Sequence, residues 1–323
     1  MRKPIGIGLY GSNAHQVEEQ LRDCAHGRLI AHAALRRDPG PPATAYTSLA
    51  ELLTDERVEL VSLCSPRRAD QAADAIACLR AGKHVYAEKP AALDNATLDT
   101  ILETARETGR QFHEMAGTVF EQPFWALRRL VRAGDLGEII QVWAQKSYPA
   151  SLDHRPQDEA VDGGLIRQCG IHAVRMVEHL TGLHVNSVEA VETRLGNPHA
   201  VEGGALHMAA SLMLTLNNGA VASVIANYCN PRGFVTRGND QVRLFGTRGM
   251  AEITDGGTRT RHVIGDLDLG PVPGVDEPAE LFFHTYLRHL RGLCEMPMTL
   301  EEELHPLRIV NEAKARARLS TGI

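Results

Sequence analysis

Two kinds of apolar pattern alternate along residues 5–109 of the chain. Short apolar runs are typical of buried strands, and between them apolar side chains recur every three or four positions, as on one face of a helix. A capping box, Ser48-Leu49-Ala50-Glu51, marks the start of one such helix. The alternation predicts an α/β fold with a doubly wound parallel sheet. The predicted strands are residues 5–9, 29–34, 58–64 and 84–87, and the predicted helices begin near residues 14, 48, 69 and 95.

Strand patterns dominate the second half of the chain. Asn217-Asn218-Gly219 is typical of a hairpin turn between two of these strands. The change of pattern predicts a second domain, with a boundary near Glu121-Gln122-Pro123, so that the domains are residues 1–121 and 122–323. Residues 256–257 and 265–278 are predicted to be surface loops. The predicted strands are 139–148, 185–193, 205–216, 220–228 and 241–253, and helices are predicted at 279–293 and 300–319.

The segment 81–90 is the most informative part of the chain. Gly82 is typical of the residue that follows a helix, and Pro90 cannot join a strand ladder. The short strand between them therefore delivers Lys89 to the carboxyl edge of the predicted sheet, where open α/β sheets bind their ligands. The alternative is that Lys89 is a solvated loop lysine, because lysine side chains are mostly exposed.

A glycine-containing turn follows the first predicted strand. Residues 6–11 match the letters GxGxxG, but only five residues precede Gly6, too few for the strand that must come first. A later register places the turn at residues 9–14, where Gly11 allows a close approach to a pyrophosphate and a helix beginning at residues 12–15 points its N–H groups at the phosphates. The alternative is an ordinary tight turn. The predicted cofactor contacts here are Leu9, Gly11, Ser12, Asn13 and Ala14.

One helical face in the second half carries polar side chains four positions apart. Gln168 and His172 are four positions apart, and Arg175 and His179 continue the same helical face. This pattern has two interpretations: a functional face, or a solvated stripe on an amphipathic helix.

Composition and charge argue against several classes of function for this chain. The 323 residues are 43% apolar and carry a net charge of −6 with no basic run, which argues against nucleic acid as a partner. We find no secretory segment and no apolar run long enough to span a membrane, so we expect a soluble, cytoplasmic protein. The six cysteines are scattered and are expected to be reduced, and no histidine and acid pair has convincing metal spacing, so we predict no metal.

With these motifs in order, the chain resembles the glucose–fructose oxidoreductase / inositol dehydrogenase / rhizopine catabolism (Gfo/Idh/MocA) family over nearly its whole length. The resemblance implies a Rossmann domain followed by an α/β domain with a large, open, mostly antiparallel sheet. The most specific match is Gly82-Lys83-His84-Val85-x-x-Glu88-Lys89-Pro90. Further matches lie at residues 134–139, at residues 163–172, which contain Gln168 and His172, and at residues 244–249.

The resemblance also implies an NAD(P)-dependent reaction. Lys89 and His172 would flank the substrate carbon that faces the nicotinamide, the lysine donating to the developing alkoxide and the imidazole taking the proton in the other direction. Gln168 occupies a position where many family members carry aspartate, and an amide cannot accept a proton. Three explanations stay open: Gln168 is a substrate clamp, the substrate has different proton needs, or catalysis is lost and only ligand binding is retained.

Cofactor choice depends on the end of the second predicted strand. An NAD site usually has an acid there, and none lies near residue 34. Arg36 or Arg37 could instead hold the 2′-phosphate of NADP, which gives a slight preference for NADP; the alternative is that both are solvated. By resemblance, Ser65 and Pro66 lie where the nicotinamide ribose passes; the alternative is a plain strand-ending turn. Glu88 could anchor the same region or be a surface acid, and the Lys89–Pro90 bond is expected to be cis.

The predicted function is therefore an NAD(P)-dependent dehydrogenase or reductase acting on a sugar, polyol or related cyclic alcohol. Two alternatives of the same fold are an NAD-dependent glycosidase and a non-catalytic protein that senses a dinucleotide or sugar. We expect a homodimer or homotetramer formed through the second sheet, because one face of an open sheet would otherwise be exposed.

Overall fold

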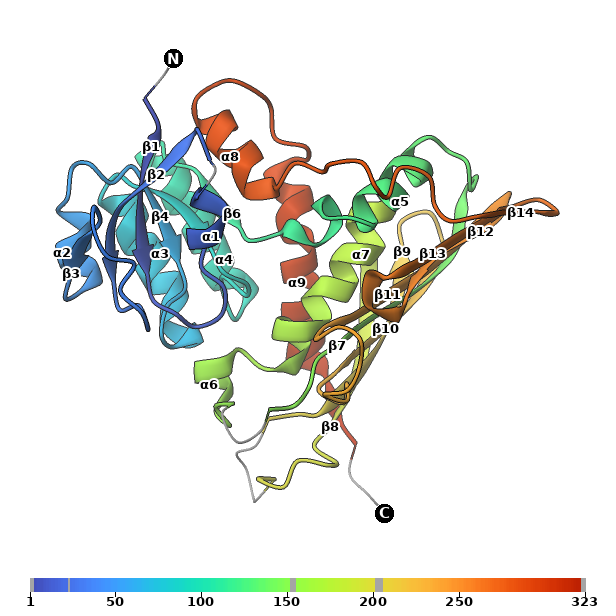
Figure 1. Cartoon of the computed structure of the whole chain (residues 1–323). Helices are drawn as coiled ribbons and strands as arrows, with labels where there is room; N and C mark the ends of the chain where they lie inside the picture. The colour runs from blue at the N-terminus through green and yellow to red at the C-terminus, as the bar shows by residue number, and fades with distance from the viewer. Residues whose placement is uncertain (1–2, 23, 152–154, 201–205, 321–323) are drawn as a thin grey trace. The chain divides into compact units, whose positions relative to one another are not determined.

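The computed structural model of the chain describes residues 3–22, 24–151, 155–200 and 206–320 (Figure 1). Contacts divide the chain into two compact units. Unit 1 consists of Met1–Met115, Ala160–Gly163 and Leu281–Leu300, and unit 2 consists of Ala116–Glu159, Gly164–Glu280 and Glu301–Ile323. The predicted domain limits, 1–121 and 122–323, remain a prediction.

Unit 1 is built on a six-stranded parallel sheet, which confirms the predicted doubly wound fold. The strand order is β3-β2-β1-β4-β5-β6, so the chain starts in the middle of the sheet and reverses direction after β3. Consecutive apolar residues of β1 and β4 are buried because helices cover both faces of a parallel sheet. The strands are β1 (Ile5–Tyr10), β2 (Gly27–Ala33), β3 (Thr44–Tyr46), β4 (Leu60–Leu63), β5 (His84–Ala87) and β6 (Phe112–Glu114).

The predicted helix ends of unit 1 are confirmed where a capping residue marks them. The Ser48 side chain accepts the N–H of Glu51 at the start of α2 (Leu49–Leu53). Gly82 takes a positive φ of 76° after α3 (Gln71–Arg80), which follows the short η1 (Arg68–Asp70). The N–H of Gly82 donates to Leu79 O and that of Lys83 to Cys78 O, the paired bonds of a Schellman end. Helix α4 (Asn95–Thr108) has the predicted limits.

The prediction that a helix begins at residues 12–15 is wrong. Helix α1 covers only Glu18–Leu21. Ala14 has a φ of 90°, which no α-helix can contain, so the backbone first makes a loop after β1. Gly27 is the first residue of β2 and is paired with Ile5.

A helix from late in the sequence belongs to unit 1. Helix α8 (Phe282–Leu290), predicted at 279–293, places Phe283 against Tyr86, with ring centroids 4.9 Å apart. The Tyr286 hydroxyl donates to Val85 O at 3.4 Å. These contacts cover part of the parallel sheet.

Unit 2 contains a nine-stranded sheet in the order β14-β13-β12-β11-β7-β10-β9-β8-β15. Only the β10–β7 and β15–β8 pairs are parallel, so the expected mostly antiparallel sheet is confirmed. The strands are β7 (Ile139–Ser147), β8 (Val185–Thr193), β9 (Ala209–Leu216), β10 (Val221–Asn227), β11 (Asn239–Gly246), β12 (Gly249–Thr254), β13 (Arg259–Ile264), β14 (Leu267–Gly270) and β15 (Arg318–Leu319).

Several predictions for unit 2 need correction. Strands β13 and β15 were not predicted, and β14 lies within the predicted loop 265–278. The predicted strand segment 241–253 consists of β11 and β12, and the turn between them lies in the 244–249 match, where the resemblance implies a strand turn. The helix predicted at 300–319 is α9 (Leu300–Arg316), which ends before β15. Residue 205, where a strand was predicted to begin, lies outside the described residues.

Helices gather on one face of this sheet (Figure 1). Helix α7 (Ile171–Thr181) packs on β7, β10 and β11, α5 (Phe124–Arg132) packs against α7, and α9 lies on the same side. The strand β9 shows the consequence: Leu212 and Leu214 are buried, whereas Met213 between them is 72% exposed. One face of the sheet is therefore core, and the other is open in this chain.

Candidate active site

Lys89 follows directly after β5, at the carboxyl edge of the parallel sheet. Its side chain is buried, with only 8% of the residue exposed, so the alternative of a solvated loop lysine is wrong. Its Nζ lies 3.8 Å from a carboxylate oxygen of Glu88, which is also buried. The Lys89–Pro90 peptide bond is cis, as expected from the resemblance.

Buried polar side chains hold the turn that contains Lys89. The Gln71 amide, at the start of α3, donates to Glu88 O and to Pro90 O, the second bond at 3.1 Å. On the far side of the turn the N–H of Ala91 donates to the carboxylate of Glu114 at 2.8 Å. Because both holding groups are fully buried, the backbone on either side of the lysine is fixed.

The glycine turn after β1 is anchored to the two neighbouring strands. The N–H of Gly11 donates to Ala33 O at 3.0 Å, and the N–H of Asn13 donates to Cys64 O at 3.2 Å. Gly11 has a φ of 75°, and a Cβ atom built on it would lie 2.0 Å from Cys64 O. Only glycine therefore fits this turn.

The same turn can accept a phosphate. Within the described residues, the N–H groups of Ser12 and Ala14 donate to no protein acceptor. Backbone N–H groups left available in a loop with a positive φ, as at Ala14, form an anion-binding site without help from a helix. The residues present therefore fit a dinucleotide, and Leu9, which is fully buried, contributes packing.

Asn13 ties this turn to the loop after β4. Its side-chain amide donates to Pro66 O at 3.3 Å and to Val161 O at 2.8 Å. Ser65 is buried, and its hydroxyl donates to a carboxylate oxygen of Asp74 at 2.7 Å. Burial raises the pKa of Asp74, and this hydrogen bond opposes the rise. The structure thus gives Asn13 and Ser65 local anchoring contacts.

Two arginine side chains follow the end of β2. A carboxylate oxygen of Asp38 lies 3.1 Å from the ring of His32 and accepts the N–H of Gly40 at 2.7 Å. Arg36 and Arg37 are exposed, and neither forms an ion pair with a described residue. Asp38, the acid closest in sequence to the end of β2, therefore already has partners. The guanidinium groups of Arg36 and Arg37 form no ion pair with a described residue.

In unit 2, Gln168 and His172 lie at the start of a long helix. Gln168 is in a π-helical turn (Ile166–Gly170), and His172 is in the first turn of α7. The His172 Nδ1 lies 2.9 Å from the hydroxyl of Thr118, which belongs to the 3₁₀ turn η2 (Gly117–Phe120). This contact holds the imidazole of His172 in place.

The alternative of a solvated stripe is wrong. Gln168 is only 6% exposed, and Arg175 and His179 are buried as well. Burial lowers the pKa of His179 to about 3, and its Nε2 lies 3.0 Å from Glu302 O, so this histidine is neutral and structural. His172, on the same face, is half-buried.

A buried lysine and a half-buried tyrosine accompany His172. Lys146 Nζ lies 2.6 Å from the Asp240 carboxylate and 4.5 Å from the ring centroid of Tyr148. The Tyr148 and His172 rings meet edge to face, with centroids 6.4 Å apart. Burial raises the pKa of Tyr148, so the phenol is neutral and can donate. No sequence pattern indicates Thr118, Tyr148 or Asp240, because no spacing links them to His172.

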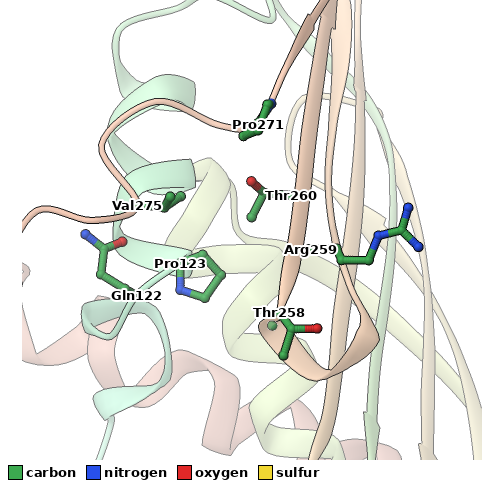
Figure 2. Close-up of a pocket in the computed structure, with 8 residues that line it drawn as sticks. Gln122, Pro123, Thr258, Arg259, Thr260, Pro271 and Val275 are labelled. Atoms are coloured by element: carbon green, nitrogen blue, oxygen red, sulfur yellow. The ribbon is translucent and has the colours of Figure 1, made fainter. Parts of the chain in front are cut away.

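A pocket of about 550 Å³ lies elsewhere in unit 2, at the start of β13 (Figure 2). Figure 2 shows the guanidinium of Arg259 pointing away from the side where Pro123 and Val275 lie. The pocket wall contains none of the predicted site residues, and its polar groups are threonine hydroxyls and an amide. Its lining residues are Gln122, Pro123, Gly257, Thr258, Arg259, Thr260, Pro271 and Val275.

Among the described residues, no helix combines the length and apolar character needed to cross a bilayer.

Two family profiles match this chain. Residues 5–115 match the oxidoreductase family with an NAD-binding Rossmann fold, and residues 124–252 match the GFO/IDH/MocA C-terminal domain. The myo-inositol 2-dehydrogenase of Thermotoga maritima is 26% identical over 64% of this chain, and the match spans only 59% of that enzyme. The scyllo-inositol 2-dehydrogenase (NADP(+)) of Bacillus subtilis is 24% identical over 96% of this chain and 91% of its own length. Among solved structures, an aldose-aldose oxidoreductase from Caulobacter crescentus complexed with glycerol has a TM-score of 0.80 at 20% identity, covering 97% of both chains, which shows a shared fold.

Proposed function

The chain belongs to the Gfo/Idh/MocA family of NAD(P)-dependent oxidoreductases, and we propose that it transfers a hydride between the nicotinamide and a hydroxyl-bearing carbon of a sugar, polyol or related cyclic alcohol. The observation that carries the proposal is the buried Lys89 in a turn fixed by Gln71 and Glu114 at the carboxyl edge of the parallel sheet. The inositol dehydrogenases among the relatives support the substrate class.

The proposed chemistry uses Lys89 and His172. A bound oxidised nicotinamide would supply the hydride acceptor for the carbinol carbon. Lys89 donates a hydrogen bond to the substrate oxygen, which stabilises alkoxide character as the C–H bond breaks. His172 takes the hydroxyl proton. In the tautomer whose Nδ1–H donates to the Thr118 hydroxyl, Nε2 carries the lone pair that accepts this proton. In reduction of a ketone the same proton returns to the oxygen.

Gln168 is proposed as a substrate clamp. Its amide can donate to one hydroxyl and accept from another, and it carries no charge. His172 is then the base of the reaction, and Gln168 positions the alcohol.

The test is turnover with a panel of sugars and polyols that includes myo-inositol and scyllo-inositol, followed by the absorbance of the reduced nicotinamide. We expect Lys89→Met to lower kcat at least about 100-fold while cofactor affinity stays measurable. The matched control is Lys3→Met, because Lys3 is exposed. Unchanged turnover in Lys89→Met would refute its role. Glycoside cleavage without net reduction, or cofactor binding without either reaction, would support the glycosidase or the sensor instead.

We propose NADP as the preferred cofactor. Support comes from the two unpaired arginines at the end of β2 and from Asp38, whose carboxylate contacts His32. The 2′-phosphate would be held by Arg36 or Arg37. In fluorescence titrations we expect the double variant Arg36→Ala/Arg37→Ala to lose about tenfold in NADP affinity with little change for NAD. Arg28→Ala, an exposed arginine at the other end of β2, is the control. A tenfold preference of the wild-type protein for NAD would overturn the proposal.

We propose that a second copy covers the open face of the nine-stranded sheet. Ile140, Met213, Val221 and Phe245 are exposed on β7, β9, β10 and β11. An apolar sheet face of this kind is typical of an interface. Light scattering during gel filtration should give the mass of a dimer or tetramer, and Met213→Lys should shift it toward the monomer. A monomeric wild-type protein would contradict the proposal.

A further inference from the structure

Three metal-ligating side chains converge in unit 2, away from the residues assigned above. Glu178 lies near the end of α7, His184 precedes β8, and His305 is in α9. One ligand atom from each lies within 4.8 Å of the other two. No sequence spacing predicts this group, because Glu178 and His305 are 127 positions apart in the chain.

The arrangement has the dimensions of a metal site. His305 Nδ1 lies 2.7 Å from Glu178 Oε1, and the imidazole rings of His184 and His305 have centroids 5.1 Å apart with an angle of 77° between their planes. Two imidazoles bound to one tetrahedral zinc, each at about 2.0–2.1 Å from nitrogen to metal, have ring centroids roughly 5 Å apart. The two rings are therefore already spaced as zinc ligands.

The carboxylate lacks part of its expected hydrogen bonding. Glu178 is only 3% exposed, and its Oε1 accepts the N–H of Val185 at 2.7 Å in addition to the contact with His305. Its Oε2 is buried and has no hydrogen-bond partner within the described part of the chain. A buried carboxylate oxygen in this state costs free energy that a cation would recover. His184 and His305 are half-buried, so an ion and a water molecule can reach them.

A second group of acidic and histidine side chains in unit 2 differs because it already contains a cation. Glu159, Glu192 and His207 also lie within ligand distance of one another, but the ammonium of Lys314 lies 2.8 Å from Glu159 and 2.7 Å from Glu192. That cation occupies the place of a metal. In the first group, Glu178 forms no ion pair with a described lysine or arginine.

We propose that Glu178, His184 and His305 bind one divalent transition-metal ion of the zinc class, with water as the fourth ligand. Two imidazole nitrogens and a carboxylate are ligands that Zn²⁺ prefers, whereas Ca²⁺ and Mg²⁺ require oxygen ligands. The ion would tie the end of α7, the start of β8 and α9 together.

The experiment is calorimetric titration of the chelator-treated full chain with Zn²⁺, combined with thermal unfolding. We expect one equivalent to bind and to raise Tm. His184→Gln removes a ligand but leaves the Glu178–His305 hydrogen bond in place, so the protein should fold. It should weaken binding by at least about tenfold, which is the effect of losing even an outer-sphere partner. Glu178→Gln should also weaken it, and the exposed control His199→Gln should not.

Two results would overturn the proposal. One is the absence of binding to the wild-type protein. The other is binding of equal affinity and stoichiometry in His184→Gln, which would place the metal on another of the chain's histidines. Neither result affects the proposed oxidoreductase function, since turnover is measured separately.

Discussion

Replacement of Gly11 by alanine isolates the contact that shapes the proposed dinucleotide turn. The added Cβ would lie 2.0 Å from Cys64 O, at a φ of 75°. Gly40 has the same φ of 75°, and a Cβ there would meet nothing within 4 Å. Gly40→Ala therefore carries only the cost of a left-handed conformation, about 1 kcal/mol. Gly11→Ala carries that cost and also forces the turn away from the end of β4.

The expected difference follows from this geometry. Backbone cannot yield as a flexible side chain does, so overpacking adds about 1–3 kcal/mol, and Gly11→Ala should lower the free energy of unfolding by about 2–4 kcal/mol. The shift also moves the available N–H groups of Ser12 and Ala14. Urea unfolding and NADP titration of both variants give the two readouts. Equal destabilisation of the two variants, with cofactor affinity retained in Gly11→Ala, would refute the reasoning.

Two further predictions concern proton chemistry. Thr118→Val removes the hydroxyl 2.9 Å from His172 Nδ1 and should lower kcat about tenfold and change its pH profile, while Thr118→Ser restores both; an unchanged profile would contradict the orienting role. The hydrogen bonds from Arg57 lower the pKa of Asp55 from 3.8 to about 2, despite opposing burial. Because the folded-state pKa is the lower one, the stabilisation is present above pH 4 and is lost as pH falls toward 2. Asp55→Asn should flatten that part of a plot of urea midpoint against pH, and an unchanged slope would exclude Asp55 as its source.

The sequence predicts elements where burial gives them a pattern. Helix α4 and strands β5 and β8 have the expected limits because their apolar positions face a core. Strand β14 is exposed or half-exposed along its length, and most of β13 is too, so neither has an apolar alternation to detect. At the edge of a sheet, the position and register of a strand are set by backbone hydrogen bonds alone. The side-chain sequence therefore contains little pattern that predicts such a strand.

The residues of the candidate site also divide into those that a local sequence pattern predicts and those that it does not. Gly82 and Pro90 indicate from sequence alone where Lys89 falls, because both act on the local backbone. Gln71 and Glu114, which fix that turn, are distant polar residues whose burial no periodicity reveals. The positive φ of Ala14, which removes the predicted helix start, is equally invisible, since alanine is the strongest helix former.

Gln168 bears on the three explanations left open by the sequence. An aspartate in this buried turn would be an ionised carboxylate that requires a cation partner. On β7, the strand that contacts this turn, the ammonium of Lys146 is already paired with Asp240 at 2.6 Å. A neutral amide avoids that requirement, and a glutamine side chain contains both a donor and an acceptor. The held imidazole of His172 keeps a proton acceptor in the same helical segment, which a site that only binds its ligand would not need. The arrangement therefore favours Gln168 as a substrate clamp over a loss of catalysis.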